Sequence, residues 1–239
     1  MGKLIKAEFL KLSKSLGYKV MLRCSLGLGV LLGAIPLIDI EIIEASGYSI
    51  YLLILKETQV QALFISIFAA IFICNEFSNR TFSTGIMNGC SRFSLLLSKA
   101  VAYVVGVISI IFVYPITAVS ITTIHGGFGE TSFEIWQYLF ITTCLFIVGI
   151  IALSSFCFTL AILIKNVGGT TGAGFGLLLL LILVGDFTPF EPIMKFTFTY
   201  QLAHASQPES IFLYLAVTCS TIVISLIVSS NIFKRSELK

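Results

Sequence analysis

Residues 74–99 of the chain read CNEFSNRTFSTGIMNGCSRFSLLLSK and carry four charged side chains, Glu76, Arg80, Arg92 and Lys99. This polar stretch lies between two long apolar segments, each of which is long enough to cross a bilayer as a helix. A polar stretch in that position is a loop held at one face of a membrane. The face that it occupies determines which molecules it can meet.

The composition of the chain indicates an integral membrane protein. Of its 239 residues, 57% are hydrophobic and only 11% are charged, whereas soluble domains are about 25% charged. The apolar segments are continuous runs, which favour helices over the alternating strands of a membrane barrel. We therefore predict an all-α fold, a single polytopic domain over residues 1–239. Its six predicted spans lie at about 20–38, 59–76, 93–124, 135–164, 167–184 and 211–233.

The first 19 residues carry five lysines among apolar residues. Ile5, Phe9, Leu12 and Leu16 recur at helical spacing, and a basic amphipathic helix of this kind lies on a membrane surface. We predict such a helix over residues 1–19. The alternative is a helix that simply continues into the first span.

The distribution of lysine and arginine predicts the orientation of the spans, because these residues concentrate in cytoplasmic loops. With six spans and a cytoplasmic N-terminus, only Lys56 and Lys195 of the 15 basic residues fall outside, which leaves 13 inside. We therefore expect both termini in the cytoplasm. The stretch 74–99 is then the largest cytoplasmic loop and a docking surface for a soluble partner.

The sequence contains no motif that predicts catalysis within this chain. It lacks a phosphate-binding G-x-x-x-x-G-K-[ST] loop, a G-x-S-x-G elbow and an H-E-x-x-H pair. Its two histidines, His125 and His204, fall in the outer loops without the spacing of metal ligands. We expect no catalytic residue, metal site, cofactor or nucleic-acid partner. Few ionisable residues lie within the spans, which argues against ion-driven transport and favours an energy source outside this chain.

Two sets of glycines are spaced four residues apart within predicted spans. Gly29 and Gly33 lie in the first span, and Gly168, Gly172 and Gly176 share one face of the span at 167–184. Small residues at this spacing let membrane helices approach closely, so we predict that both sets serve helix packing. The spacing does not decide between packing within one subunit and packing between two.

The loop resembles a known signature. Glu76, Arg80-Thr81, Gly89-Cys90-Ser91-Arg92 and Ser98-Lys99 are similar to the pattern E-x-x-x-[GR]-T … G-x-S-R … S-K between the second and third spans of ABC-2 type permeases. The chain most resembles the small six-span permeases of bacitracin resistance and lantibiotic immunity. It departs from them at Cys90, where many relatives have another residue, and at Arg80, which replaces a frequent glycine.

This resemblance implies the permease subunit of an ATP-driven exporter in a bacterial cell membrane. Two copies of a separate ATPase chain would bind the ATP and Mg²⁺, and a second permease copy or paralogue and membrane lipid would complete the partners. Residues 77–90 would include a coupling helix that docks into the ATPase. The implied coupling residues are Glu76, Phe77, Arg80, Thr81, Phe82, Gly85, Gly89, Ser91, Arg92 and Lys99. The implied cargo is amphipathic or hydrophobic, such as an antimicrobial peptide or a lipid-associated antibiotic.

The loop between the last two spans carries aromatic residues and prolines, among them Phe187, Pro189, Phe190 and Pro192. These four residues form either an outer gate that lines the exit or a simple cap over the bundle. Two other functions remain as alternatives for the whole chain. One is a non-transporting membrane anchor or sensor for a cytoplasmic partner, and the other is a secondary carrier.

Overall fold

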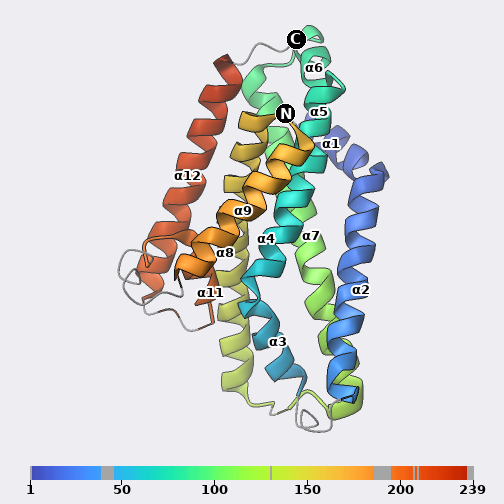
Figure 1. The fold of residues 1–239 in the computed structure, drawn as a ribbon, viewed down its shortest axis with the longest axis vertical. Helices are drawn as coiled ribbons and strands as arrows, with labels where there is room; N and C mark the ends of the chain where they lie inside the picture. Colours follow the sequence, from blue (N-terminus) through green and yellow to red (C-terminus); the bar gives the residue numbers. More distant parts are fainter. Residues whose placement is uncertain are drawn as a thin grey trace.

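The computed structural model describes residues 2–38, 46–129, 131–185, 195–206, 208 and 210–235. Throughout these ranges the regular secondary structure is helical. Six helical segments of the described residues, one of them the unbroken run Thr58–Ser78, are long and apolar enough to cross a membrane, which confirms that part of the prediction. Figure 1 shows them side by side in an elongated bundle. By helix length and composition, the chain is a multi-pass membrane protein.

The helices have the following bounds. They are α1 (Gly2–Lys14), α2 (Leu16–Ile38), α3 (Gly47–Lys56), α4 (Thr58–Ala69), the π-helical turn η2 (Ala70–Cys74), α5 (Asn75–Ser78), α6 (Thr81–Met87), α7 (Arg92–Gly126), α8 (Phe133–Ile164), α9 (Val167–Gly185), α11 (Phe198–Ala203) and α12 (Ile211–Arg235).

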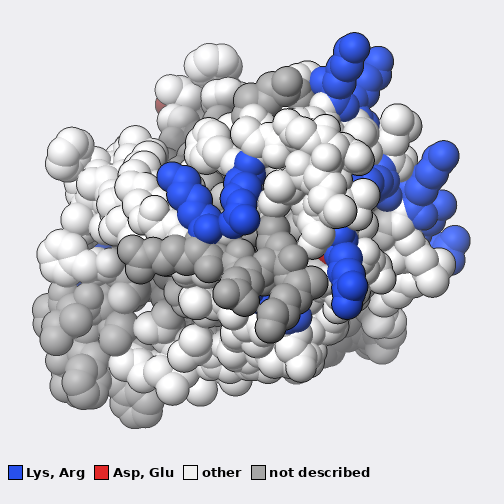
Figure 2. All heavy atoms as spheres, turned by 90° about the horizontal axis from the view of Figure 1, so that it is seen from above, with Lys and Arg blue, Asp and Glu red and all other residues white. Residues whose placement is uncertain are grey.

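One end of the bundle collects α1, α6 and the last turn of α12, and the connection from α7 to α8 lies at the opposite end (Figure 1). We call the first of these the basic end. Figure 2 looks onto it and shows many lysine and arginine side chains but few acidic atoms. Its exposed basic side chains include Lys3, Lys6, Lys11, Lys14, Arg80, Arg92 and Lys234.

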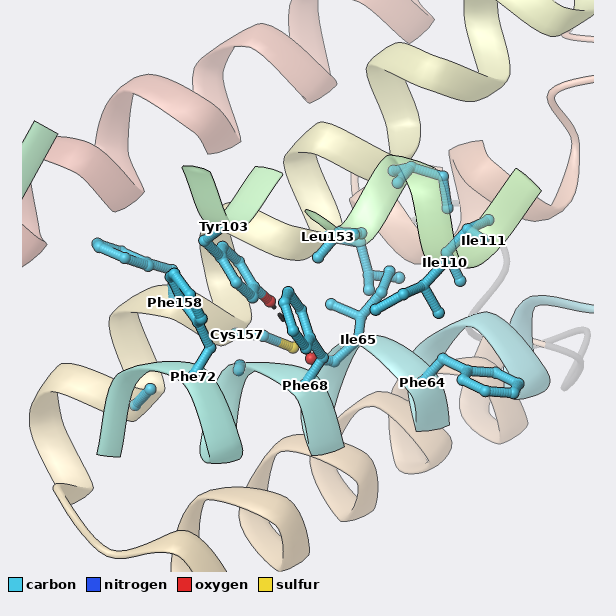
Figure 3. Close-up of a cluster of buried hydrophobic side chains, with 14 of the residues drawn as sticks. Phe64, Ile65, Phe68, Phe72, Tyr103, Ile110, Ile111, Leu153, Cys157 and Phe158 are labelled. Carbon is cyan, nitrogen blue, oxygen red and sulfur yellow. Dashed lines mark hydrogen bonds between the residues drawn. The ribbon is translucent and has the colours of Figure 1, made fainter. Parts of the chain in front are cut away.

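The bundle centre is an aromatic and aliphatic core formed by α4, η2, α7 and α8 (Figure 3). The rings of Phe68 and Tyr103 stack with their centroids 5.6 Å apart. The buried Tyr103 hydroxyl donates a hydrogen bond to the Ile65 carbonyl oxygen, 3.3 Å away. The core therefore satisfies its polar phenol while it packs α4 against α7.

Helices α2 and α7 approach closely at the glycines of the first span. A Cβ atom on Gly29 would lie 1.7 Å from the Thr117 hydroxyl oxygen and 2.5 Å from the Tyr114 carbonyl oxygen. One on Gly33 would lie 3.0 Å from the Ala118 carbonyl oxygen. The packing predicted for Gly29 and Gly33 is therefore present within one subunit.

The glycines of α9 behave differently. Within 4 Å, a Cβ atom on Gly172 or Gly176 would meet nothing, and one on Gly168 would meet only the side chain of Asn166. The face turned inward instead carries Thr170, Gly174 and Leu178, which are all buried. Gly168, Gly172 and Gly176 therefore do not pack against another helix of this subunit, because burial of Thr170 and Leu178 turns their face outward. Packing of this face between two subunits stays a prediction.

Residues 47–56 form a helix where we expected only an outer loop. The segment is apolar, and α3 buries Ile54 and Leu55 as it packs alongside α7. A helix of ten residues is too short to cross a bilayer alone, so hydropathy did not indicate a span. Lys56, expected outside, lies at the junction between α3 and α4.

The junction between α3 and α4 frees backbone carbonyls at the end of α3, and buried side chains bond to them. The Gln61 amide nitrogen donates to the Leu55 carbonyl oxygen at 3.3 Å. The Tyr114 hydroxyl donates to the Ile54 carbonyl oxygen at 3.5 Å. Where a helix is interrupted inside an apolar bundle, the freed backbone groups need such partners, because an unpaired buried backbone group costs stability.

The N-terminal helix ends at Lys14, and residues 16–19 already belong to α2, so the predicted extent of 1–19 is too long. The four residues of the suggested outer gate, Phe187, Pro189, Phe190 and Pro192, lie outside the described residues. The same loop contributes the short helix α11, which packs Phe198 and Leu202 into the bundle.

Candidate functional site at the basic end

Lys99 of α7 is the centre of a buried charge cluster, because its side chain is only 1% exposed. A buried ammonium group needs compensating charges, since leaving it unpaired is strongly unfavourable. Its Nζ atom lies 2.6 Å from Oε2 of Glu76 on α5 and 2.9 Å from Oε2 of Glu8 on α1. One lysine therefore links three helices.

Glu8 is the member of this cluster that sequence reasoning missed. Its side chain is 4% exposed, and its second carboxylate oxygen pairs with Nζ of Lys11 at 3.2 Å. The sequence does contain an indication of its role, because Glu8 is the only acidic residue before Asp39. It also precedes Leu12 by four residues, which places it on the buried face of α1. An acid on the apolar face of a basic helix predicts a buried cationic partner.

Thr81 couples the start of α6 to this cluster. Its hydroxyl donates to the Glu76 carboxylate, and the hydroxyl oxygen also lies 3.0 Å from the Glu76 backbone carbonyl oxygen. Between α5 and α6 the chain turns at Arg80, whose φ of 55° is in the left-handed region. The turn thus brings Thr81, Glu76 and Lys99, three residues of the sequence signature, into one site.

The inner face of α6 is held by Phe82, which is 1% exposed. The Phe82 ring lies between those of Phe77 and Phe233, with centroids 4.6 Å and 4.9 Å away. Lys99 Nζ lies 5.1 Å from the Phe82 ring centre, within the range of a cation–π interaction. Gly85 packs near Leu95, since a Cβ atom there would lie 3.1 Å from that side chain. Helix α6 is therefore bound to α5, α7 and α12.

The outer face of α6 is exposed and carries Arg80, Thr84 and Met87. Met87 is 85% exposed, although it is a large apolar residue at an end of the bundle rich in charge. Methionine is a flexible and polarisable contact residue at protein–protein surfaces. The sequence alone did not single it out, because neighbouring polar residues surround it.

The remaining signature residues position the start of α7. Gly89 has a φ of 83°, and the Ser91 hydroxyl caps α7 by accepting from the Ser94 backbone amide at 3.2 Å. Glu76 pairs with Lys99, and Arg92 donates to the Lys234 carbonyl oxygen at 2.8 Å. Arg92 thereby links α7 to the end of α12.

We expect Arg80→Gly to stabilise the protein by about 1 kcal/mol, because a residue other than glycine in the left-handed region is unfavourable by about that amount. Thermal unfolding of the purified protein in detergent would measure the change. Thr84→Gly is the matched control, since a glycine inside α6 should destabilise it. An unchanged or lower stability of Arg80→Gly would contradict the backbone geometry of this turn.

No protein-family model and no curated protein matches this chain. Among the residues described, no group of three or more His, Cys, Asp and Glu side chains could hold a metal ion. The distinguishing feature of the site is its geometry. It offers buried ion pairs that join α1, α5 and α7, and a short helix that rests on them with an exposed outer face.

Proposed function

We propose that the chain is the permease subunit of an ATP-driven ABC-2 type exporter, with a separate ATPase as its partner. The position and contacts of α6 support this proposal most strongly. It is a short helix between the second and third apolar spans, it rests on the Lys99 cluster, and it exposes Met87 at the basic end. In this proposal α6 is the coupling helix, α1 lies at the membrane interface, and both termini are cytoplasmic in a bacterial cell.

The contacts of α6 suggest how a movement of the ATPase would reach the spans. Thr81 connects α6 to Glu76 and Lys99, and Phe82 connects it to Phe233 of α12. Displacement of α6 would thus move the cytoplasmic ends of several helices together, as a rigid-body switch. Closure of two ATPase chains on ATP and Mg²⁺ would supply the force. A second permease copy or paralogue would complete the complex.

The proposed cargo is amphipathic or hydrophobic, such as an antimicrobial peptide or a lipid-associated antibiotic, moved out of the cell or the membrane. The apolar character of the described spans supports this class. Outside the Lys99 cluster and the α3–α4 junction, few ionisable side chains lie along these helices, so a small charged solute would find few partners.

The exposed methionine of α6 provides the test. We expect Met87→Asp to reduce co-purification with an ABC ATPase encoded beside this chain by at least about ten-fold, because an interface anchor contributes about 1.4 kcal/mol or more. Met87 is exposed, so its substitution should leave the bundle folded. The measurement is the amount of ATPase retained on the tagged permease, together with ATP hydrolysis of the complex.

Ser13→Asp is the matched control, since it adds the same charge to an exposed position of α1 at the same end. Equal ATPase retention by Met87→Asp and the wild type would refute α6 as the docking helix. Retention of an ATPase by a wild-type chain that exports nothing would instead favour the membrane-anchor alternative.

A further inference from the structure

An apolar cleft of about 220 Å³ lies between α7, α8 and α12. Its apolar lining includes Leu97, Val101, Val104, Ile151, Phe158 and Leu226. Two polar residues, Tyr103 and Ser155, also reach it, but their hydroxyls donate to the Ile65 and Ala152 carbonyl oxygens. The cleft therefore presents an apolar surface to any molecule that binds in it.

A second hollow of about 400 Å³ lies along α12 nearer the basic end. Leu226 lines both, so the two hollows adjoin at this residue, and together they are here called the α12 groove. The lining of the second hollow is Phe93, Val223, Leu226, Ile227, Ser230, Asn231 and Lys234. The groove thus changes from apolar at Ile222 to polar and basic at Lys234.

The length of the groove matches one leaflet of a membrane. From Ile222 to Lys234 the helix advances by about 18 Å, at about 1.5 Å per residue. The hydrocarbon of one leaflet is about 15 Å thick, half of a typical core. A lipid chain in the groove would therefore place its headgroup beside Lys234, at the level of the basic end.

The charge at that end selects among headgroups. The Lys234 side chain is exposed, and the surrounding face carries many basic and few acidic groups (Figure 2). Asn231 is also exposed there and can donate hydrogen bonds to a phosphate oxygen. A basic cluster at the mouth of an apolar groove favours an anionic lipid over a zwitterionic one.

We propose that the α12 groove binds an anionic phospholipid, with an acyl chain in the cleft between α7, α8 and α12 and the phosphodiester at Lys234. The site rests on the shape and charge of the groove and does not depend on the export function. It adds a specific lipid ligand on the side of the bundle formed by α7, α8 and α12.

Native mass spectrometry of the full chain in detergent tests this with equal amounts of dioleoyl phosphatidylglycerol and dioleoyl phosphatidylcholine. We expect preferential retention of phosphatidylglycerol and an about five-fold loss of that preference in Lys234→Gln, from the usual effect of one lysine near an anionic surface. Leu226→Trp should obstruct the groove and reduce retention of the lipid. Val101→Trp, which enters the cleft from α7, is a second obstructing variant in case Leu226→Trp does not fold.

Matched controls distinguish binding at this site from a general attraction of the anionic lipid to basic residues. Lys14→Gln removes an exposed lysine of α1, and Ile224→Trp adds a bulky side chain to an exposed position of α12 outside the groove lining. Both should retain phosphatidylglycerol as the wild type does. The proposal is overturned by equal retention of the two lipids, by a loss in Lys14→Gln as large as in Lys234→Gln, or by obstructing variants that fold and retain the lipid. Displacement by glycerophosphoglycerol without acyl chains would show a soluble-phosphate site and also overturn it.

Discussion

Lys99→Met is expected to lower the free energy of unfolding by about 3–5 kcal/mol, the typical cost of removing one partner from a buried ion pair. The substitution keeps the volume of the side chain but leaves the carboxylates of Glu8 and Glu76 without their shared cation. Among the described residues, the cation left beside Glu8 is Lys11, whose side chain is half exposed. Unfolding of the detergent-solubilised protein, followed by helical circular dichroism, would measure the loss.

The matched variant neutralises the whole cluster. Glu8→Gln and Glu76→Gln combined with Lys99→Met should recover much of the lost stability, because replacing every charge of a buried cluster leaves none uncompensated. Lys11→Met should cost less than about 1 kcal/mol, since exposed ion pairs contribute little. If Lys99→Met alone unfolds like the wild type, the ion pairs do not hold α1 and α5 to α7.

Gly29→Val is expected to destabilise the bundle by about 3 kcal/mol, at the upper end of the range for overpacked sites. The added Cβ would lie 2.5 Å from the backbone oxygen of Tyr114, and a backbone atom cannot move aside as a flexible side chain can. Helices α2 and α7 would have to separate along their contact. The measurement is the same unfolding experiment, with cysteine crosslinking between α2 and α7 as a second readout.

Gly27→Val is the control, because a Cβ atom on Gly27 would meet nothing within 4 Å. It makes the same substitution in the same helix, so it carries the same change in helix propensity. A similar destabilisation by both variants would mean that valine acts on α2 itself and not on its contact with α7.

Hydropathy and charge predicted the large-scale features of the fold. The six apolar helices follow from long continuous apolar runs, and the collection of lysine and arginine at one end follows from their positions in the loops (Figure 2). The signature also located the site, since Glu76, Thr81 and Lys99 meet beneath α6. These features depend on local composition and spacing, which a sequence records directly.

Other features depend on contacts between distant residues. Glu8 and Lys99 are 91 residues apart, and only the packing of α1 against α7 brings them together. Spacing of four residues in α9 fits the exposed glycines 168, 172 and 176 as well as the buried positions 170, 174 and 178. Periodicity identifies such faces but cannot choose the inward one. The choice depends on neighbours such as Ser66 of α4.

The pairing of Glu8 with Lys99 also has a consequence for biosynthesis. The ribosome produces α1 first, but its buried partner arrives only when α7 has been inserted. Until then α1 lacks its main attachment, because the described contacts of Glu8 outside α1 are with Lys99. A chain that stalls before α7 therefore carries a loose N-terminal helix within reach of proteases. Docking of α1 through Glu8 therefore follows the insertion of α7.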